Sequence, residues 1–214
     1  MNYKSLREWI DILEDSHMIK HVRKEVSLEY EIAAIGKKAC GKYALIFDNP
    51  KDSSIPVVTG LTGSREMLSK ALNVPVPELA SYFEKAQSNP GLCKLINKSE
   101  APVKEMVTKD VNLYDFPIPI HHEKDSGPYI TSGVIVAKNP VTGERNLSIH
   151  RLQVTDKNHL GILLLPRHLM HFQRLAEEKN QPLEIAIVIG LDPIVMLASQ
   201  ALTPLGQDEF CIAG

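Results

Sequence analysis

Apolar residues near the start of the chain recur at the spacing of an amphipathic helix. An i, i+3, i+4, i+7 pattern begins at Leu6, and Ser5 with Glu8 matches a capping box just ahead of it. Further helices are expected at residues 29–41, 64–73 and 77–88, and short apolar strands at 19–22, 44–49 and 56–61. This alternation of helices and strands predicts an α/β first half.

The hydrophobic period changes after a proline-rich stretch at residues 116–128. Strands are expected at 129–138, 145–154, 161–166 and 183–190, and helices at 167–179 and 193–201. The connectors between the first three strands are rich in turn residues, which predicts an antiparallel, barrel-like meander. We therefore expect an α+β chain with an N-terminal α/β domain at residues 1–110 and an antiparallel domain at 111–214, whose last apolar run forms a strand.

The sequence RNLSIHRLQV, residues 145–154, places strong hydrogen-bonding groups on both faces of one predicted strand. Asn146, Ser148 and His150 would lie on one face, and Leu147, Ile149 and Arg151 on the other. Asn146 offers a neutral oxygen ligand, while Arg151 offers a rigid donor fork for a carboxylate or phosphate. A simpler interpretation is that both residues form cross-strand pairs at an exposed barrel edge.

Two further polar clusters follow this strand. Arg167 and His168 stand at the start of a predicted helix, where free backbone N–H groups favour an anion. His168 follows Asn146 by one strand, a turn and a second strand, so a hairpin can return it to the level of Asn146. Glu209 would add a carboxylate, and the resulting donor set suits Mn²⁺ or Mg²⁺ better than structural zinc. The simpler role for His168 is a helix cap or a surface residue.

The composition excludes several other classes of protein. With 43% hydrophobic and 23% charged residues, a net charge of -2 and no basic run longer than Lys37-Lys38, the chain does not resemble a nucleic-acid-binding protein. Its three cysteines are widely spaced, which argues against a disulfide framework or a zinc ribbon. No apolar run approaches the roughly 20 residues of a transmembrane helix. We expect a cytoplasmic protein.

Five motifs, taken in order, resemble the UbiD family of reversible decarboxylases. They are DSGPYITSGVIV at residues 125–136, NLSIHR at 146–151, PRH at 166–168, GLDP at 190–193 and EFCIAG at 209–214. The resemblance covers the whole chain and is strongest over residues 125–214. It implies an FMN-binding split β-barrel, prenylated FMN as cofactor, a divalent metal (usually Mn²⁺) and, in some members, K⁺.

The resemblance also implies roles for individual residues. Asn146, His168 and Glu209 would be the metal ligands, and Arg151 would lie beside the reacting carboxylate. Ala198 and Ser199 match positions that hold K⁺ in some members. The residues that would line the cofactor are Asn146, Leu147, Ser148, Ile149, His150, Arg151, Arg167 and His168.

Family members are normally longer, and their acidic proton-transfer residues lie downstream of the third metal ligand. We therefore expect the N-terminal, cofactor-binding part of a decarboxylase, with weak or no turnover alone, that forms a homo-oligomer or pairs with a C-terminal chain. Its substrate would be an aromatic (hydroxybenzoate-type) or α,β-unsaturated carboxylic acid. One alternative is a non-catalytic flavin-binding or assembly subunit. Another is a mononuclear metal hydrolase, although no GxSxG or HExxH motif is present.

Overall fold

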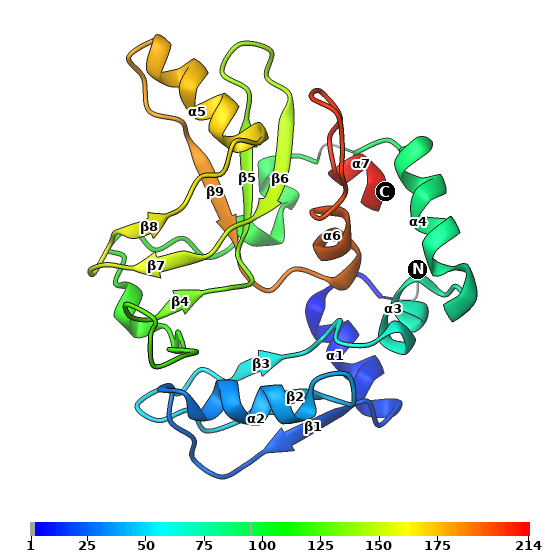
Figure 1. Ribbon diagram of the computed structural model, residues 1–214, viewed down its shortest axis with the longest axis vertical. Helices are drawn as coiled ribbons and strands as arrows, with labels where there is room; N and C mark the ends of the chain where they lie inside the picture. The colour runs from blue at the N-terminus through cyan, green and yellow to red at the C-terminus, as the bar shows by residue number, and fades with distance from the viewer. Residues whose placement is uncertain (1–2, 95) are drawn as a thin grey trace.

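The computed structural model describes residues 3–94 and 96–214 (Figure 1). Its first half has the expected alternation of elements. They are α1 (Leu6–Asp15), β1 (Ile19–Val22), α2 (Glu31–Ala39), β2 (Ala44–Phe47), β3 (Val57–Thr59), α3 (Arg65–Leu72), the 3₁₀ helix η1 (Val76–Glu78) and α4 (Leu79–Ser88). Strand β2 is central, parallel to β1 and antiparallel to β3. The predicted elements of this half are confirmed to within a few residues at each end.

Local sequence explains where these helices begin. The Ser5 hydroxyl accepts the Glu8 N–H at 3.2 Å, and the Ser64 hydroxyl accepts the Met67 N–H at the start of α3. Helix α2 ends at Ala39, just before Gly41, which has a φ of 74°. The capping box at α1 is incomplete, because the Glu8 carboxylate accepts the N–H of Lys4 rather than that of Ser5.

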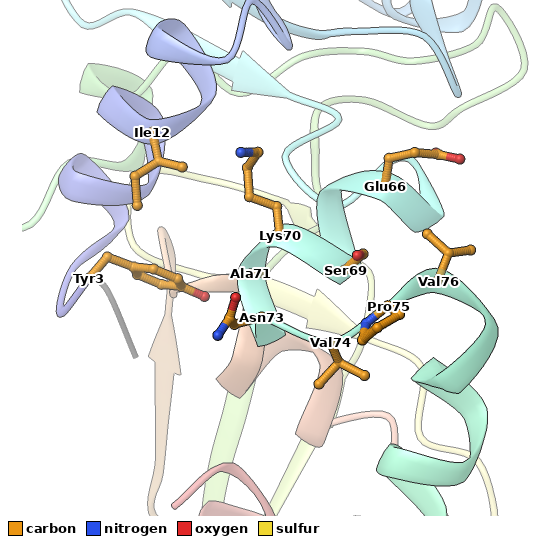
Figure 2. Close-up of a pocket in the computed structure, with 10 residues that line it drawn as sticks. All are labelled: Tyr3, Ile12, Glu66, Ser69, Lys70, Ala71, Asn73, Val74, Pro75 and Val76. Atoms are coloured by element: carbon orange, nitrogen blue, oxygen red, sulfur yellow. The ribbon is translucent and has the colours of Figure 1, made fainter.

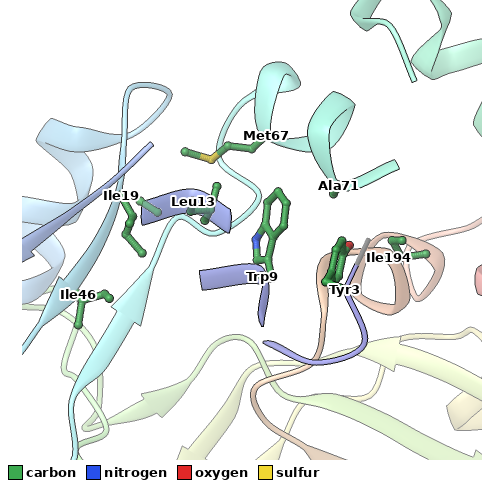
Figure 3. Close-up of a cluster of buried hydrophobic side chains, with 9 residues drawn as sticks. Tyr3, Trp9, Leu13, Ile19, Ile46, Met67, Ala71 and Ile194 are labelled. Atoms are coloured by element: carbon green, nitrogen blue, oxygen red, sulfur yellow. The ribbon is translucent and has the colours of Figure 1, made fainter. Parts of the chain in front are cut away.

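A core of apolar side chains joins this half to the end of the chain (Figure 3). Trp9 and Leu13 from α1 are fully buried, and the Trp9 indole N–H donates to the Leu61 carbonyl at 3.0 Å. Met67 from α3 packs in the same cluster, as does Ile194 from α6 (Pro193–Ala198). The C-terminal segment is therefore held against the N-terminal core by burial of apolar surface.

The second half contains two small antiparallel sheets. One has the order β4 (Tyr129–Ile130), β7 (Leu152–Val154), β8 (Leu160–Ile162), and the other β6 (Arg145–Ile149), β5 (Val134–Lys138), β9 (Ile185–Val188). Helix α5 (His168–Glu178) contacts β5 and β6. The remaining elements are α7 (Phe210–Ala213) and the 3₁₀ helices η2 (Lys98–Glu100), η3 (Pro102–Lys104) and η4 (Leu113–Asp115). The chain is thus mixed α+β, and the described residues form no closed barrel.

Two long strands expected from the sequence are each broken in the structure. Residues 129–138 divide into β4 and β5, and residues 145–154 divide into β6 and β7, because at both breaks the chain passes from one sheet to the other. Gly133 lies at one break, where an added Cβ would come within 3.2–3.3 Å of the side chains of Ile130, Leu152 and Ile187. A larger residue at this crossing would therefore crowd the three side chains, which would have to move by a few tenths of an ångström.

The expectation of a strand at the end of the chain was wrong, since residues 210–213 form α7. The Asp208 carboxylate accepts the Phe210 N–H at 3.0 Å, and the Cys211 N–H bonds the Asp208 carbonyl at 3.0 Å, so the backbone turns helically. Helix α7 contacts α4 and α6. No helix among the described residues has the length and apolar character needed to cross a bilayer.

The described part of the N-terminal half includes a histidine between two carboxylates, which predicts a pH-dependent stability. His21 Nδ1 lies 2.8 Å from Asp48 and Nε2 lies 3.0 Å from Glu14. The hydrogen bond to Asp48, followed by that to Glu14, raises the pKa of His21. A raised pKa stabilises the folded chain below the unfolded pKa of about 6.5, and this contribution is lost as pH rises through the folded value.

We therefore expect His21→Gln to lower the free energy of unfolding more at pH 5.5 than at pH 8.5. Urea denaturation at both pH values measures the difference, with the exposed His171→Gln as the matched control. Equal losses for His21→Gln at the two pH values would contradict the assignment.

Candidate active site

Three side chains that are distant in the sequence meet beside strand β6. Asn146 lies on β6, His168 is the first residue of α5, and Glu209 directly precedes α7. The Asn146 side-chain nitrogen lies 3.3 Å from His168 Nδ1 and donates to Glu209 Oε1 at 2.9 Å. The structure thus brings together the three residues predicted to be metal ligands.

Glu209 is held in place by more than this one contact. Its side chain is 1% exposed, its Oε2 accepts the Leu147 N–H at 2.8 Å, and its Oε1 also accepts the Thr203 hydroxyl at 2.8 Å. Strand β6 is at the edge of its sheet, so the Leu147 N–H has no neighbouring strand on that side. The carboxylate therefore satisfies an edge N–H in the protein interior, where a buried charge requires such donors.

One polar atom of this cluster has no partner among the described residues. Asn146 is 5% exposed, and its Oδ1 is buried without a hydrogen bond. Rotation of the amide by about 180° exchanges the positions of its oxygen and nitrogen. After that rotation Oδ1 would face His168 Nδ1 and Glu209 Oε1. An amide oxygen, an imidazole nitrogen and a carboxylate oxygen would then converge, and this donor set suits Mn²⁺ or Mg²⁺.

The other residues predicted to line the cofactor differ in accessibility. The Leu147 side chain is 2% exposed and packs inside, whereas Ser148 and Ile149 are half-buried. His150 follows the end of β6, with Nε2 3.1 Å from the Ser148 hydroxyl and Nδ1 3.4 Å from the Leu163 carbonyl. Ser148 and His150 therefore contact one another, and they can present one polar surface to a ligand.

Arg151 lies at the crossing between the two sheets, outside both β6 and β7. It donates to the Asp125 carboxylate at 2.9 Å, and its guanidinium lies 4.2 Å from the centre of the Tyr129 ring. The hydrogen bond from Arg151 lowers the pKa of Asp125, so the pair stays charged near neutral pH. The neighbouring His121 has its pKa lowered, chiefly by burial. With 57% of its side chain exposed, Arg151 remains accessible to a ligand.

The structure also describes three more residues that the sequence singled out as candidate cofactor or K⁺ ligands. Arg167 is exposed at the N-cap of α5, where its side chain makes no capping hydrogen bond. Ala198 and Ser199 are buried at the end of α6, and the Ser199 hydroxyl donates to the Met196 carbonyl at 2.7 Å. The Ser199 oxygen accepts the Gln200 side-chain amide at 3.3 Å and keeps one further lone pair for a cation.

Sequence reasoning missed several groups that support the cluster. Thr203 was not singled out, although it donates directly to Glu209. Arg145 and Asp208 form an ion pair whose members precede Asn146 and Glu209. The sequence hints at this pair only because Arg145 and Asp208 are each next to a predicted metal ligand. No local pattern indicates that two residues 63 positions apart will form an ion pair.

A second group of possible metal donors lies at the start of α7 and includes Cys211 of that helix. Cys93, Asp208 and Cys211 place one ligand atom each within 4.8 Å of one another, and the two sulfurs are 3.2 Å apart. However, both Asp208 oxygens are already occupied, by Arg145 and by the Phe210 N–H. The adjacent guanidinium also repels a cation, and burial is the main factor that raises the pKa of Cys93 to about 11. This group is therefore a poor metal site.

A cavity of about 710 Å³ lies between α1, α3 and η1 (Figure 2). Figure 2 shows Tyr3 extending toward Asn73 at the end of α3. None of the predicted site residues lines this cavity. The Asn146, His168 and Glu209 side chains occupy a different part of the molecule, so the cavity adds nothing to their chemistry.

Comparison with known proteins identifies the family of the chain. Residues 10–86 match the 3-octaprenyl-4-hydroxybenzoate carboxy-lyase N-terminal domain, and residues 94–214 match the Rift-related domain of the same family. The chain belongs to the UbiD family. The UbiD match to residues 94–214 includes all three side chains of the cluster.

The relatives that are named as decarboxylases differ in their substrates. The chain is 36% identical to anhydromevalonate phosphate decarboxylase of Methanothermobacter thermautotrophicus over 97% of its length and 48% of that protein. It also resembles the structure of the UbiD-class enzyme HmfF from Pelotomaculum thermopropionicum with prFMN (TM-score 0.95, 50% identity, 99% of this chain and 50% of the other). Vanillic acid decarboxylase of Sedimentibacter hydroxybenzoicus gives a TM-score of 0.92 at 29% identity, covering 99% and 48%. The chain thus spans about half the length of the relatives it matches.

The structural role of Glu209 leads to a prediction about stability. Glu209→Ala leaves the Leu147 N–H and the Thr203 hydroxyl without their acceptor, so we expect a loss of about 1–3 kcal/mol in the free energy of unfolding. Urea denaturation measures this loss, with the exposed Glu123→Ala as control. The hydrogen-bond assignment would be wrong if both substitutions had the same small effect.

Proposed function

We propose that this chain carries the prenylated-FMN and divalent-metal site of a UbiD-type reversible, non-oxidative decarboxylase. The substrate would be an aromatic, hydroxybenzoate-type acid or an α,β-unsaturated carboxylic acid. The observation that supports this proposal is the meeting of Asn146, His168 and Glu209, with a buried Asn146 oxygen that lacks a partner. Mn²⁺ is the metal we favour for this donor set.

The proposed metal ligands have a clear electrostatic purpose. The phosphate of a flavin mononucleotide carries roughly two negative charges near neutral pH, by analogy with phosphate esters whose second pKa is about 6. A divalent cation held by one carboxylate and two neutral donors keeps one net positive charge, which would offset part of the phosphate charge. His168 stands at the N-terminus of α5, whose free N–H groups add positive potential on the same side. Ser148, His150 and Arg167 would line the cofactor beside these ligands, as would Leu147 and Ile149 through their backbone.

Arg151 is our candidate for binding the substrate carboxylate. One terminal nitrogen donates to Asp125, and the remaining N–H groups can bind a second carboxylate. The contacts with Asp125 and Tyr129 orient the guanidinium before a ligand arrives, which lowers the entropy cost of binding. Prenylated FMN, when bound, would supply the carbon chemistry of CO₂ loss, while the chain supplies position and charge.

The same proposal extends to the architecture. The two antiparallel sheets of the second half would form the FMN-binding split barrel, and residues 1–110 and 111–214 would be the two domains. K⁺ would bind near Ala198 and Ser199, and the protein would act in the cytoplasm. The protein would form a homo-oligomer or pair with a C-terminal chain.

A second candidate function is a non-catalytic, flavin-binding or assembly subunit of a decarboxylase. It is favoured by the similar vanillic acid decarboxylase ShVdcCD, which includes a separate component named ShVdcD. In this second function the chain would have the same metal and cofactor site. It differs in that activity would appear only when a second chain is added.

The proposed site predicts the effect of two substitutions on cofactor binding. After coexpression with a prenylated-flavin synthase, native mass spectrometry of the purified chain should show the added mass of metal and cofactor. We expect Glu209→Gln and His168→Ala each to remove it, because each deletes one of the three donors that hold the cation.

The matched controls are His171→Ala and Glu177→Gln, two exposed residues of α5 outside the cluster. Both should retain full occupancy, and circular dichroism should show that all four variants are folded. Full occupancy in both Glu209→Gln and His168→Ala would contradict the ligand assignment.

A further inference from the structure

An ion pair joins the residues that immediately precede two of the candidate ligands. Arg145 Nε donates to Asp208 Oδ2 at 2.7 Å, and a terminal guanidinium nitrogen contacts the same oxygen. Arg145 precedes Asn146 on β6, and Asp208 precedes Glu209 at the start of α7. The pair therefore connects the same two backbone segments that carry the candidate metal ligands.

This ion pair is more constrained than the surface pairs of the chain. Its side chains are 26% and 20% exposed, whereas those of Lys157 and Asp110 are 58% and 94% exposed at a separation of 3.4 Å. Exposed pairs contribute little, because solvent screens the charges and both side chains lose entropy. The Arg145–Asp208 pair is largely shielded from water, so its geometry is better defined.

Two further contacts attach the ion pair to α7. The Asp208 Oδ1 accepts the Phe210 N–H at 3.0 Å, and the Arg145 guanidinium lies 5.1 Å from the centre of the Phe210 ring. Both oxygens of Asp208 are thus engaged, one by the strand residue and one by the backbone of the helix. The start of α7 cannot shift along β6 without breaking one of these contacts.

The two acidic residues hold β6 in different ways. Successive side chains of a strand point to opposite faces, so Arg145 and Asn146 leave β6 on opposite sides. Asp208 engages Arg145, while Glu209 engages Asn146 and the Leu147 N–H at the edge. The segment before α7 is therefore attached to β6 at three consecutive residues.

We propose that Arg145 and Asp208 form a positioning pair that fixes the Glu209 carboxylate relative to Asn146 and so tightens divalent-cation binding. The effect on the cation rests on the proposed function, whereas the effect on Glu209 rests on the fold alone. Neither residue contacts the ligand atoms of the cluster in the described contacts, so both act through the backbone. Loss of such a supporting contact typically lowers metal affinity by about 10–100-fold.

The test uses Asp208→Asn, a substitution of nearly identical shape whose amide oxygen can still accept the Phe210 N–H. Two readouts are taken on the full chain without flavin. Amide hydrogen exchange of Leu147, followed by NMR, reports whether Glu209 still accepts its N–H. Titration with Mn²⁺ alone, followed by electron paramagnetic resonance of the free ion, reports affinity.

We expect faster exchange at Leu147 relative to the other amides of β5 and β6, and Mn²⁺ affinity reduced by about 10–100-fold. Arg145→Met should act in the same way, and Arg145→Lys should recover part of the loss because it keeps the charge. Asp110→Asn, which removes the exposed pair with Lys157, should change neither readout.

Unchanged relative exchange at Leu147 in Asp208→Asn would overturn the proposal, even if the melting temperature fell. A merely structural pair would instead accelerate all amides of β5 and β6 together, and that result would also overturn it. If Arg145→Met does not fold, Asp208→Asn and Arg145→Lys decide the question. If the unaltered chain binds no Mn²⁺, or Glu209→Gln binds it equally well, the proposed metal site fails, and the Leu147 exchange still decides whether the pair positions Glu209.

Discussion

The buried carboxylate of Glu209 is the interaction on which the site depends. A charged group that is 1% exposed requires strong donors, and Glu209 receives them from the backbone N–H of Leu147, the hydroxyl of Thr203 and the amide of Asn146. These donors belong to β6 and to the segment before α7. The Glu209 side chain therefore satisfies a free N–H of the edge strand β6 and attaches this strand to the segment before α7. Without that acceptor the edge of β6 would keep a buried, unsatisfied N–H group.

The same carboxylate can serve a structural role and a ligand role together. Oε2 is committed to the Leu147 N–H, which fixes the orientation of the group, while Oε1 accepts the Asn146 amide, whose nitrogen also lies 3.3 Å from His168 Nδ1. A cation bound at Oε1 would leave the edge hydrogen bond intact. Rotation of the Asn146 amide would then replace a donor by an acceptor and give Oδ1 a partner. In the proposed site, this rotation would bring Oδ1 to the cation without movement of β6, and it would move Nδ2 away from Glu209 and His168.

Local sequence patterns were sufficient to predict the helices and strands that depend mainly on their own residues. Helices α1 and α3 follow from their apolar period and their serine caps, and β2 follows from a run of buried apolar residues. The breaks at residues 131–133 and 150–151 were missed, although residues 131–133 are Thr-Ser-Gly and the apolar alternation changes phase between Ile149 and Leu152. Helix α7 has only four residues, too few to be stable alone, so its formation depends on tertiary contacts. For the site, motif order indicated Asn146, His168 and Glu209, whereas Thr203 and the Arg145–Asp208 pair become visible only when distant segments meet.

The break between β6 and β7 also changes how Arg151 must be understood. On a continuous strand, the alternation of side chains between the two faces would set the direction of the Arg151 side chain. Arg151 lies at the crossing between β6 and β7, so this alternation does not determine its direction. Its direction is set instead by the Asp125 carboxylate and the Tyr129 ring, both from the motif DSGPYITSGVIV. Two motifs that the sequence presents separately therefore meet at this side chain. Asp125 neutralises part of its charge and occupies one of its nitrogens, so a substrate carboxylate would meet an arginine that is already oriented and still has free donors.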